Sequence, residues 1–414
     1  MLDGWENAEA KRPLDGEIKG ATSLGGRTPA QVVASGLRID QLSTPMMTLS
    51  RSAVAHNVAT MAAWCQSEHL LIAPHGKTTM APALWRRQLD AGAWGITIAN
   101  EPQLAVALSR GVPRVMLANP LVRSAGADAV RAALESGRLA DVIVWADSID
   151  AVEQIAAADD AAPSIGVLVE IGAEGGRTGV RTPREARIVA ERVAATPGLE
   201  LRGVAGYEGA VADYREEPGR FTAYLDSVAS AFGEVKPLIA RDDAIVSIGG
   251  SAGIARTVRL LRDRIPSDDA TVIIRSGVYI AHDDGYYLDQ AEPELPLRAA
   301  VAVWARVLST PEPGLALLDA GRRDVSYDQG LPVVLGAHRA GTRLAPVAPT
   351  VTALNDQHAF VRYDSDGPAL AVGDLVELGV SHPCTTFDRW PVILEVDERG
   401  DSTAPVIGVV QTHF

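Results

Sequence analysis

The chain has 414 residues, which at about 150 residues per domain allows two or three domains, or one large barrel with a smaller partner. Apolar residues make up 47% and charged residues 22%, and 38 glycines with 25 prolines are too few for a collagenous or low-complexity chain, so wholesale disorder is excluded. The formal net charge of −14 argues against a broad electropositive surface for nucleic acid or anionic lipid.

Cysteine usage and the opening of the chain indicate the compartment. The two cysteines, Cys65 and Cys384, are too few for a disulfide framework. Residues 1–20 lack the apolar run of a secretory signal peptide, and no stretch approaches the ~18 uninterrupted apolar residues that a membrane-spanning helix needs. We therefore expect a reduced, cytoplasmic protein that binds neither nucleic acid nor membrane.

Short apolar runs alternate with longer stretches of helical spacing through the first two thirds of the chain. The runs are residues 70–74, 94–99, 114–119, 141–146, 164–172, 199–207, 244–250 and 271–277. Eight continuous apolar strands with helical segments between them predict an α/β fold, a closed parallel (β/α)8 TIM-type barrel. An open doubly wound sheet is the alternative, and it is less favoured because no GxGxxG motif opens the first unit.

After about residue 295 the pattern changes to strand-like alternation with turn signals and no long amphipathic segment. This change predicts a separate, mostly β domain at the C-terminus. The opening segment is polar and Gly-rich, and we expect it to associate with the β domain. The predicted division is therefore residues 1–43 as an N-terminal segment, 44–295 as the barrel and 296–414 as the C-terminal β domain.

Functional residues of a parallel barrel lie at the C-terminal ends of its strands. The first run leads into PHGKTTM, which places Lys77 at the barrel mouth. Arg177 follows the fifth run on a glycine-rich loop, and Tyr207 closes the sixth run. A lone lysine in a loop is usually only solvated, so a catalytic role for Lys77 depends on these neighbours.

The seventh run ends in a glycine-rich turn, Ser247 to Gly253, that leads directly into a helical segment. Free backbone N–H groups and the helix dipole favour phosphate there, although the same glycines could serve only a tight turn. Gly277 ends the eighth run, and the loops after strands seven and eight are the recurrent phosphate site of such barrels. A lysine facing a phosphate site across one barrel mouth suggests pyridoxal phosphate held as a Schiff base.

With these residues in place, the sequence resembles the fold type III pyridoxal phosphate enzymes, the alanine racemase-like barrels, and within them the D-serine dehydratase and D-threonine aldolase group. The resemblance covers roughly residues 44–390 and rests on short motifs that occur in order along the chain. These motifs are TPMMTLSRSAVAHNVATM, PHGKTTM, GRTGV, GYEG, SIGGS, RSGVYIAHD and HPCTTFDRW. The resemblance also implies a homodimer whose sites are completed across the two subunits.

The resemblance implies roles for individual residues. Lys77 matches the Schiff-base lysine, and Arg177 matches the arginine beside the phenolic oxygen of the cofactor. Arg275 matches an arginine that meets the pyridine nitrogen in alanine racemases, although a strand-end arginine could equally belong to a structural ion pair. A guanidinium cannot accept a proton, so Arg275 would keep that nitrogen unprotonated and weaken the ring as an electron sink. The other implied cofactor contacts are Tyr207 near the ring, the phosphate cup of Gly249, Gly250 and Ser251, and Gly277 with Tyr279 closing that cup.

A candidate metal pair lies near the C-terminus. His382 and Cys384 are separated by one residue, so both side chains can reach one metal, and imidazole with thiolate favours zinc over magnesium or manganese. Without the resemblance, the cysteine is more often a small buried hydrophobe in a β domain. The D-serine dehydratases of the group carry a metal at such a pair, whereas the D-threonine aldolases tend to show His-x-Asp. His358 could line the same pocket or be an ordinary surface histidine.

The resemblance and the metal pair together predict a metal-assisted lyase. A divalent metal, most simply zinc, would ease expulsion of a β-hydroxyl, so we expect β-elimination from a D-3-hydroxy amino acid such as D-serine, giving a 2-oxo acid and ammonia. The D preference comes from the resemblance alone. D-threonine aldolase chemistry, giving glycine and an aldehyde, is the alternative. An amino-acid racemase or a non-catalytic pyridoxal phosphate carrier fits less well, because racemisation needs no metal pair and the carriers lack a C-terminal β domain.

Overall fold

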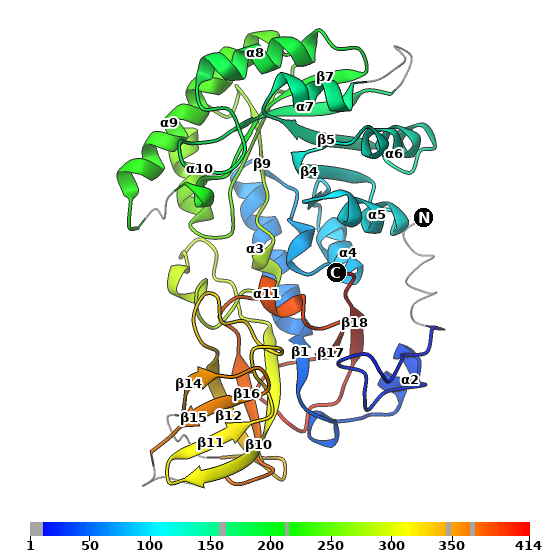
Figure 1. Ribbon diagram of the computed structural model, residues 1–414, viewed down its shortest axis with the longest axis vertical. Coiled ribbons are helices and arrows are strands. Elements are labelled where there is room, and N and C mark those ends of the chain that lie inside the picture. Colours follow the sequence, from blue (N-terminus) through cyan, green and yellow to red (C-terminus); the bar gives the residue numbers. More distant parts are fainter. Residues whose placement is uncertain (1–10, 157–162, 212–214, 345–348, 365–368) are drawn as a thin grey trace.

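Two β-sheets organise the protein, one in each half of the molecule (Figure 1). The computed structural model describes residues 11–414 except 157–162, 212–214, 345–348 and 365–368. Helices cover the outer side of the first sheet, and the strands of the second lie together in the other half of the molecule. The predicted combination of an α/β barrel with a C-terminal β domain is confirmed.

The first sheet has eight parallel strands in the order β2-β9-β8-β7-β6-β5-β4-β3. Its two ends are joined by a parallel bridge between His75 and Thr97, and the Thr97 N–H donates to the Pro74 carbonyl at 2.9 Å. Each of the eight predicted runs coincides with one strand, and only β4 extends beyond its run, by one residue. The strands are β2 Leu71–Ile72, β3 Ile96–Ile98, β4 Arg114–Pro120, β5 Asp141–Ala146, β6 Ile165–Ile171, β7 Leu199–Gly206, β8 Ile245–Ile248 and β9 Thr271–Ile274.

Side-chain caps and prolines mark the first turn of most helices between these strands. At α8 the Thr182 hydroxyl accepts from the Glu185 N–H at 3.2 Å, and the Glu185 carboxylate accepts from the Thr182 N–H at 3.0 Å, so each residue satisfies a free amide of the other. A proline in the first turn starts several others. The helices are α3 Arg51–Ser67, α4 Pro82–Asp90, α5 Glu101–Ser109, α6 Ser124–Glu135, α7 Ile149–Ile155, α8 Pro183–Ala194, α9 Pro218–Val235 and α10 Ile254–Arg262.

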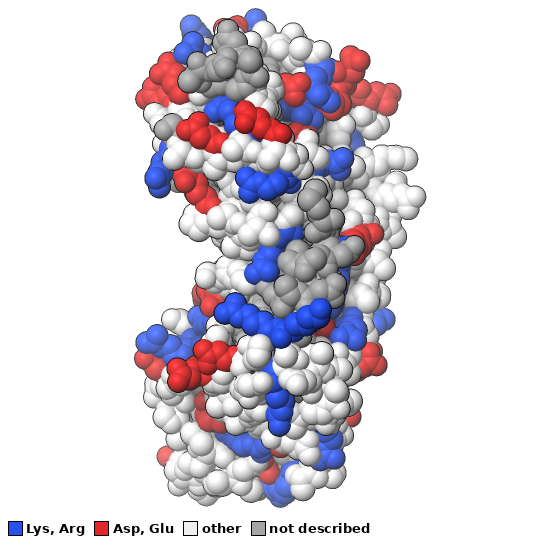
Figure 2. All heavy atoms as spheres, turned by 90° about the vertical axis from the view of Figure 1, so that its right-hand side faces the viewer, with Lys and Arg blue, Asp and Glu red and all other residues white. Residues whose placement is uncertain are grey.

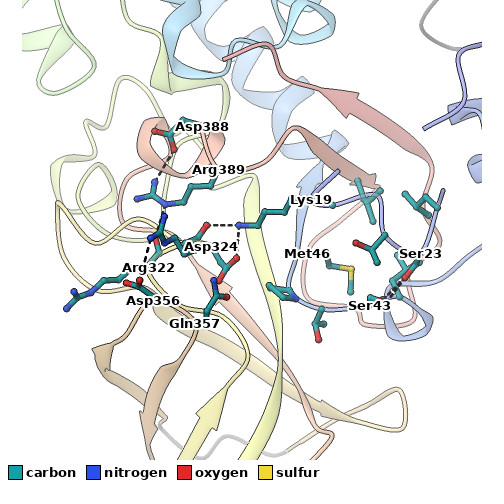
Figure 3. A pocket seen from close by; sticks show the side chains of 18 of the residues that line it. Lys19, Ser23, Ser43, Met46, Arg322, Asp324, Asp356, Gln357, Asp388 and Arg389 are labelled. Atoms are coloured by element: carbon teal, nitrogen blue, oxygen red, sulfur yellow. Dashed lines mark hydrogen bonds and ion pairs between the residues drawn. The ribbon is translucent and has the colours of Figure 1, made fainter. Parts of the chain in front are cut away.

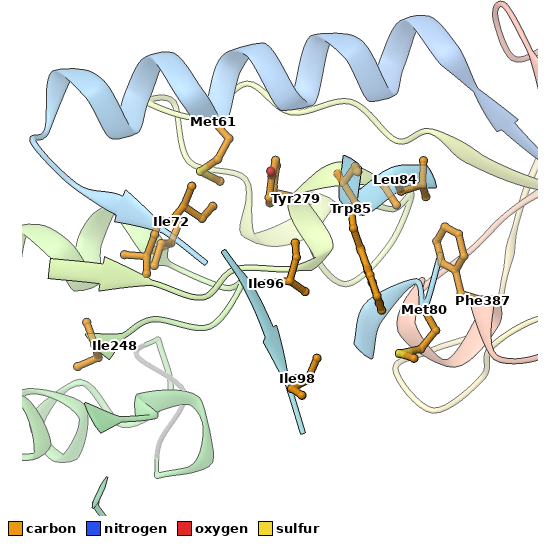
Figure 4. Close-up of a cluster of buried hydrophobic side chains, with 14 of the residues drawn as sticks. Met61, Ile72, Met80, Leu84, Trp85, Ile96, Ile98, Ile248, Tyr279 and Phe387 are labelled. Atoms are coloured by element: carbon orange, nitrogen blue, oxygen red, sulfur yellow. The ribbon is translucent and has the colours of Figure 1, made fainter. Parts of the chain in front are cut away.

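The barrel strands are buried on both faces, which explains their uninterrupted apolar sequence. Side chains inside the barrel form their own cluster, which includes Met116, Ile143, Leu168 and Ile273, all with no exposed surface. Side chains on the outer face pack beneath the helices. One part of that outer core lies around Trp85 of α4 and Met61 of α3 (Figure 4).

The second sheet has ten strands and is antiparallel except for one pair. Its main path runs β13-β12-β16-β10-β1-β17-β18, with β11 pairing β10 and β15, and β14 pairing β15. The strands are β1 Met46–Ser50, β10 Val301–Glu312, β11 Leu315–Leu318, β12 Val333–Arg339, β13 Thr342–Arg343, β14 Thr350–Leu354, β15 Ala359–Arg362, β16 Leu375–Gly379, β17 Val392–Val396 and β18 Gly408–Gln411.

The position of β1 differs from the expected boundary at residue 44. The sequence placed this strand with the barrel, but β1 pairs antiparallel with β10 and parallel with β17, inside the second sheet. Its residues are all buried, so its apolar run carries no sign of which sheet it joins. Only the backbone hydrogen bonds with strands more than 250 residues away decide the matter.

The N-terminal segment packs on the second sheet. Helix α2, Pro29–Ala34, contacts β18, and the side chains of Leu24, Val32 and Ile39 share one buried cluster with Trp304 of β10. Residues 1–10 of this segment lie outside the described residues.

The surface carries both charge signs. On the face shown in Figure 2, acidic and basic side chains are interspersed over both halves, and the outline narrows between them. Within the described ranges, no helix is both long enough and apolar enough to cross a membrane.

Replacing Gly203 by alanine should lower the free energy of unfolding by about 3 kcal/mol, because it combines backbone strain with overpacking. Gly203 of β7 has a φ of +145°, and an added Cβ would lie 1.9 Å from the Ile245 carbonyl oxygen of β8. Chemical unfolding followed by circular dichroism measures the change.

The matched control is Gly233→Ala in α9, where an added Cβ meets nothing within 4 Å. That substitution should stabilise the protein by about 0.5–1 kcal/mol, since alanine loses less backbone entropy in a helix. Equal effects of the two substitutions would contradict the packing argument.

Candidate active site

A cavity of about 400 Å³ opens at the C-terminal end of the barrel strands. Loops that follow several barrel strands line it, and the second domain contributes residues from two segments. The lining includes every predicted site residue except Tyr279. The predicted members are Lys77, Arg177, Tyr207, Gly249, Gly250, Ser251, Arg275, Gly277, His382 and Cys384.

Lys77 lies on a single turn of 3-10 helix, Gly76–Thr78, directly after β2, and its side chain is exposed to the cavity. Partial desolvation in the cavity lowers the pKa of Lys77 below its ordinary value. Cys384 opposes this effect, whereas the guanidinium groups of Arg177 and Arg275 lower the pKa further. A larger fraction of the lysine is therefore in the neutral, nucleophilic form than for a lysine in water.

Two glycines permit close contacts between the segments that line the cavity. A Cβ on Gly277 would lie 2.5 Å from the His75 carbonyl oxygen and 2.6 Å from the Thr78 hydroxyl. A Cβ on Gly250 would lie 2.7 Å from the ring of Tyr207. A side chain at either position would therefore clash with its neighbours. The lining combines Lys77 with Arg177, Arg275 and the Ser251 hydroxyl, and an amine beside cationic and hydroxyl donors fits an aldehyde that carries a phosphate, such as pyridoxal phosphate.

The amide groups of the phosphate cup have a partner that the sequence did not predict. Glu208, 2% exposed, accepts from the Gly250 N–H at 2.8 Å and from the Gly249 N–H at 3.2 Å. Glu208 does not line the cavity, so these two amides point away from it. The expectation that these amides are free for phosphate is not met in this structure, because a buried carboxylate accepts from both, and their contact with a phosphate stays a prediction.

The N-terminus of α10 is likewise bound by a carboxylate. Glu292 accepts from the Ala255 N–H at 3.0 Å and from the Arg256 N–H at 2.9 Å. The helix dipole that the sequence assigned to phosphate is thus partly offset by a side chain of the protein itself. What faces the cavity is the Ser251 hydroxyl. Its oxygen accepts from the Val278 N–H and from Ser276, each at 3.2 Å, which leaves its own O–H free to donate to a ligand.

Arg275 is fixed at the floor of the cavity. It is 5% exposed, donates to the Ser247 hydroxyl at 2.6 Å and to the Gly206 carbonyl, and lies over the Trp145 ring at 4.7 Å from its centroid. Burial lowers the pKa of Arg275, and the nearby Glu208 carboxylate opposes that effect. The guanidinium is therefore held by neutral hydrogen-bond partners, and it forms no direct ion pair with any residue that the structure describes.

Arg177 and Tyr207, which both line the cavity, form a pair. The Arg177 guanidinium lies 4.9 Å from the centre of the Tyr207 ring, within range of a cation–π contact. Tyr224 of α9 anchors this pair, since its hydroxyl accepts from the Tyr207 N–H at 2.9 Å and donates to the Ile171 carbonyl at 2.7 Å.

Two further candidates, Tyr279 and His358, lie outside the cavity. Tyr279 is 4% exposed, and its side chain packs in the outer core beside Met61 and Trp85 (Figure 4). The prediction that it closes the phosphate cup is corrected: the single helical turn after Gly277 directs it into the core. His358 lies in the turn between β14 and β15 and does not line the cavity.

His382 and Cys384 reach the cavity from the second domain. Cys384 opens the short helix α11, Cys384–Phe387, and its sulfur lies 3.6 Å from the Thr78 hydroxyl, next to Lys77. Within the described residues, no group of three or more His, Cys, Asp or Glu side chains has metal-binding geometry. The nitrogen and sulfur donors fit zinc, and a pair would leave positions open for water or a substrate oxygen.

The electrostatic surroundings of His382 are anionic. Burial by itself lowers the pKa of His382, but its contacts with Cys384 and Asp328 outweigh burial and raise that pKa to about 9. A metal must compete with a proton for this ring, because only neutral imidazole is a ligand.

A larger hollow of about 1070 Å³ lies between the N-terminal segment and the second sheet (Figure 3). Its charged side chains already pair with each other, for example Lys19 with Asp324 at 2.6 Å and Arg389 with Asp388 at 3.0 Å. None of the predicted site residues lines it. Size alone therefore does not identify the site, and the chemistry favours the smaller cavity.

Several residues at the site escaped the sequence analysis. Glu208, Tyr224 and Asp328 act through bonds to residues far away in the chain, which no local pattern reports. Tyr286 and Tyr287 could have been suspected, because they lie within four residues after the RSGVYIAHD motif. Other lining residues without a sequence signal are His75, Asn119, Trp145 and Gln329.

Two family models and several known enzymes match this chain. The model of the alanine racemase N-terminal domain matches residues 49–270, more than half of the chain, and the model described as a Putative serine dehydratase domain matches residues 300–396. The D-threonine aldolase of Arthrobacter sp. is 26% identical over 371 residues, covering 87% of this chain and 90% of that protein. The D-threo-3-hydroxyaspartate dehydratase of Delftia sp. is 23% identical over 372 residues, covering 84% and 93%.

Solved structures show the same fold. A D-threonine aldolase from Filomicrobium marinum superposes with a TM-score of 0.72 at 23% identity, covering 91% of this chain and 97% of that one. A variant of D-threo-3-hydroxyaspartate dehydratase, solved in a metal-free form, superposes with a TM-score of 0.67 at 18% identity, covering 91% and 99%.

Replacing Glu208 by alanine should weaken pyridoxal phosphate binding about tenfold, because two buried amides lose their acceptor and the phosphate cup loses its support. Titration of the cofactor into the cofactor-depleted protein, followed by absorbance, measures the dissociation constant. Glu200→Ala, at the other end of β7, is the control and should leave the constant unchanged. Identical constants for both variants would show that Glu208 does not support the cup.

Proposed function

The chain belongs to the alanine racemase N-terminal domain family, and from this premise we propose that it is a pyridoxal phosphate-dependent lyase. Its reaction would be metal-assisted dehydration and deamination of a D-3-hydroxy amino acid such as D-serine, giving a 2-oxo acid and ammonia. The observation that carries the proposal is that Lys77 and the pair His382 and Cys384, from different domains, line one cavity.

The cofactor side of the proposal rests on the fit of the cavity. Pyridoxal phosphate, when bound, withdraws electrons from the α-carbon of an attached amino acid. Lys77 would hold the cofactor and then accept the Cα proton, for which its lowered pKa suits it. Arg275 has only donors to offer, so it cannot take up a proton and serves to bind and orient. Ser251 would donate its O–H to the phosphate.

The metal side rests on the donor set. His382 and Cys384 would hold a divalent metal, with zinc as the best match to nitrogen and sulfur ligands. Stabilisation of charge on a departing hydroxide is the chemistry that such a metal supplies. The Thr78 hydroxyl, 3.6 Å from the Cys384 sulfur, lies at the seam between the metal pair and Lys77. The metal-free form reported for a dehydratase of the same fold supports a metal in this group.

D-threonine aldolase chemistry is the second candidate. It would cleave the Cα–Cβ bond after deprotonation of the β-hydroxyl, giving glycine and an aldehyde. The identity of 26% to a D-threonine aldolase favours it. The dehydratase is preferred because this chain has His-x-Cys at the proposed metal pair, and the soft thiolate of Cys384 suits zinc. The resemblance associates the aldolases of the group with His-x-Asp at that place.

Incubation with D-serine, D-threonine and D-3-hydroxyaspartate should yield 2-oxo acid and ammonia, and no aldehyde or inverted amino acid. Mass spectrometry of the products separates the dehydratase, aldolase and racemase. Cys384→Ala and chelator treatment should each lower the dehydration rate by at least about 100-fold, since one open-site ligand or the metal itself is lost. Aldehyde as the main product would establish the aldolase instead.

Lys77→Ala should abolish turnover and remove the cofactor absorbance that borohydride fixes in the parent protein, because no other lysine is proposed to bind the cofactor. Peptide mapping after borohydride treatment checks the position. A label on a different lysine would contradict the assignment.

The family resemblance extends the proposal to a homodimer, with small-molecule substrate entering a site that two subunits complete. Size-exclusion chromatography with light scattering reports the mass directly, and a monomer at working concentration would contradict it.

A further inference from the structure

We propose that Asp328 is a positioning residue that fixes the ring of His382 for metal binding. The proposal rests on the metal-assisted function above and deepens it by naming a residue that is not itself a ligand. Oδ2 of Asp328 lies 2.6 Å from Nδ1 of His382. Oδ1 of the same carboxylate accepts from the Thr385 hydroxyl, also at 2.6 Å.

This geometry selects one nitrogen of the imidazole. A carboxylate is only an acceptor, so the hydrogen on the His382 ring lies on Nδ1 and points at Asp328. In the neutral ring the lone pair is then on Nε2, which is the nitrogen left for a metal. A metal-binding histidine commonly donates its second N–H to a carboxylate in this way, and loss of that partner weakens metal binding.

The segment that carries Asp328 is held against the His382 segment at three further points. The Ser326 hydroxyl accepts from the His382 N–H at 3.1 Å, and the Ser326 N–H donates to the Thr386 hydroxyl at 3.2 Å. The Ser381 hydroxyl donates to the Gly330 carbonyl at 2.6 Å. Bonds on both sides of Asp328 therefore fix the carboxylate relative to the ring before any metal arrives, which lowers the entropic cost of binding.

A purely structural ion pair is the competing explanation. The side chain of Asp328 is 40% exposed and that of His382 is 17% exposed, so the pair is screened by solvent on one side and would contribute little to stability. Such a pair would not require a hydrogen bond to the second oxygen of the Asp328 carboxylate, yet the Thr385 hydroxyl donates to that oxygen. A carboxylate held through both oxygens can keep the His382 ring in one orientation.

Asp328→Ala in the full-length protein should weaken zinc binding about 10-fold to 100-fold, measured by titration against a chromophoric chelator at fixed pH. Asp328→Asn, which keeps an acceptor oxygen but loses the charge, should lie between the parent and the alanine variant. Thr385→Val, which removes the anchor of the carboxylate, should have a smaller effect in the same direction.

Asp388→Ala is the matched control. Asp388 follows α11 and interacts with His382 through charge alone, while its hydrogen-bond partner is Arg389 at 3.0 Å. Loss of this charge should change the zinc constant by less than about threefold. A result in which Asp328→Ala and Asp388→Ala weaken zinc equally would overturn the proposal, because charge and not ring orientation would then explain both.

A second measurement separates this proposal from the function on which it rests. Nitrogen-15 spectra of the metal-free protein, recorded above the pKa of His382, report which ring nitrogen carries the hydrogen. The parent should show the Nδ1–H form and Asp328→Ala a mixture. If the parent binds no zinc, the metal-assisted function fails, yet these spectra still decide whether Asp328 sets the ring; an unchanged Nδ1–H form in Asp328→Ala overturns the positioning role.

Discussion

The bonds that join β2 to β3 are the constraint on which the site depends. The sheet order begins at β2 and ends at β3, and the Thr97 N–H bond to Pro74, with the bridge to His75, brings these two ends together. Without that junction, Lys77 would lie at the edge of an open sheet. With it, the lysine faces the loops after β8 and β9 across one mouth, and all eight barrel strands or the loops that follow them contribute residues to a single cavity.

A second constraint is the seam between the two sheets. The Asp284 N–H donates to the Val380 carbonyl at 3.0 Å, and the Asp284 carboxylate pairs with Arg399 at 3.0 Å. Gly285 permits this approach, because a Cβ there would lie 3.0 Å from the Cα of Ser381. The segment that carries His382 and Cys384 is thereby fixed beside the barrel mouth. A metal pair on one domain and a lysine on the other can act on one substrate only if this seam holds.

Carboxylates organise much of what surrounds the cavity. Glu208 holds the phosphate cup from behind, Glu292 binds the N-terminus of α10, and Asp328 binds His382. In each case the carboxylate accepts from backbone N–H groups or from the His382 ring, and so fixes the direction in which these donors point. Some of the acidic residues therefore fix the direction of hydrogen-bond donors around the cavity, and one of them, Glu208, does so while buried.

The sequence by itself determined the eight barrel strands and the C-terminal β domain, because hydrophobic periodicity is a local property. It also identified eleven site residues, of which ten line the cavity, because strand-end position and short motifs are local as well. Lys77, Arg275 and Gly277 could be placed in this way, since each lies within five residues after the end of a strand. Tertiary structure alone decided that β1 joins the second sheet, that Tyr279 turns into the core, that Glu208 takes the amides of the phosphate cup, and that Asp328 meets His382 across 54 residues. These outcomes depend on which donor finds which acceptor after the chain has folded, and a pattern of neighbouring residues carries no record of partners that far apart.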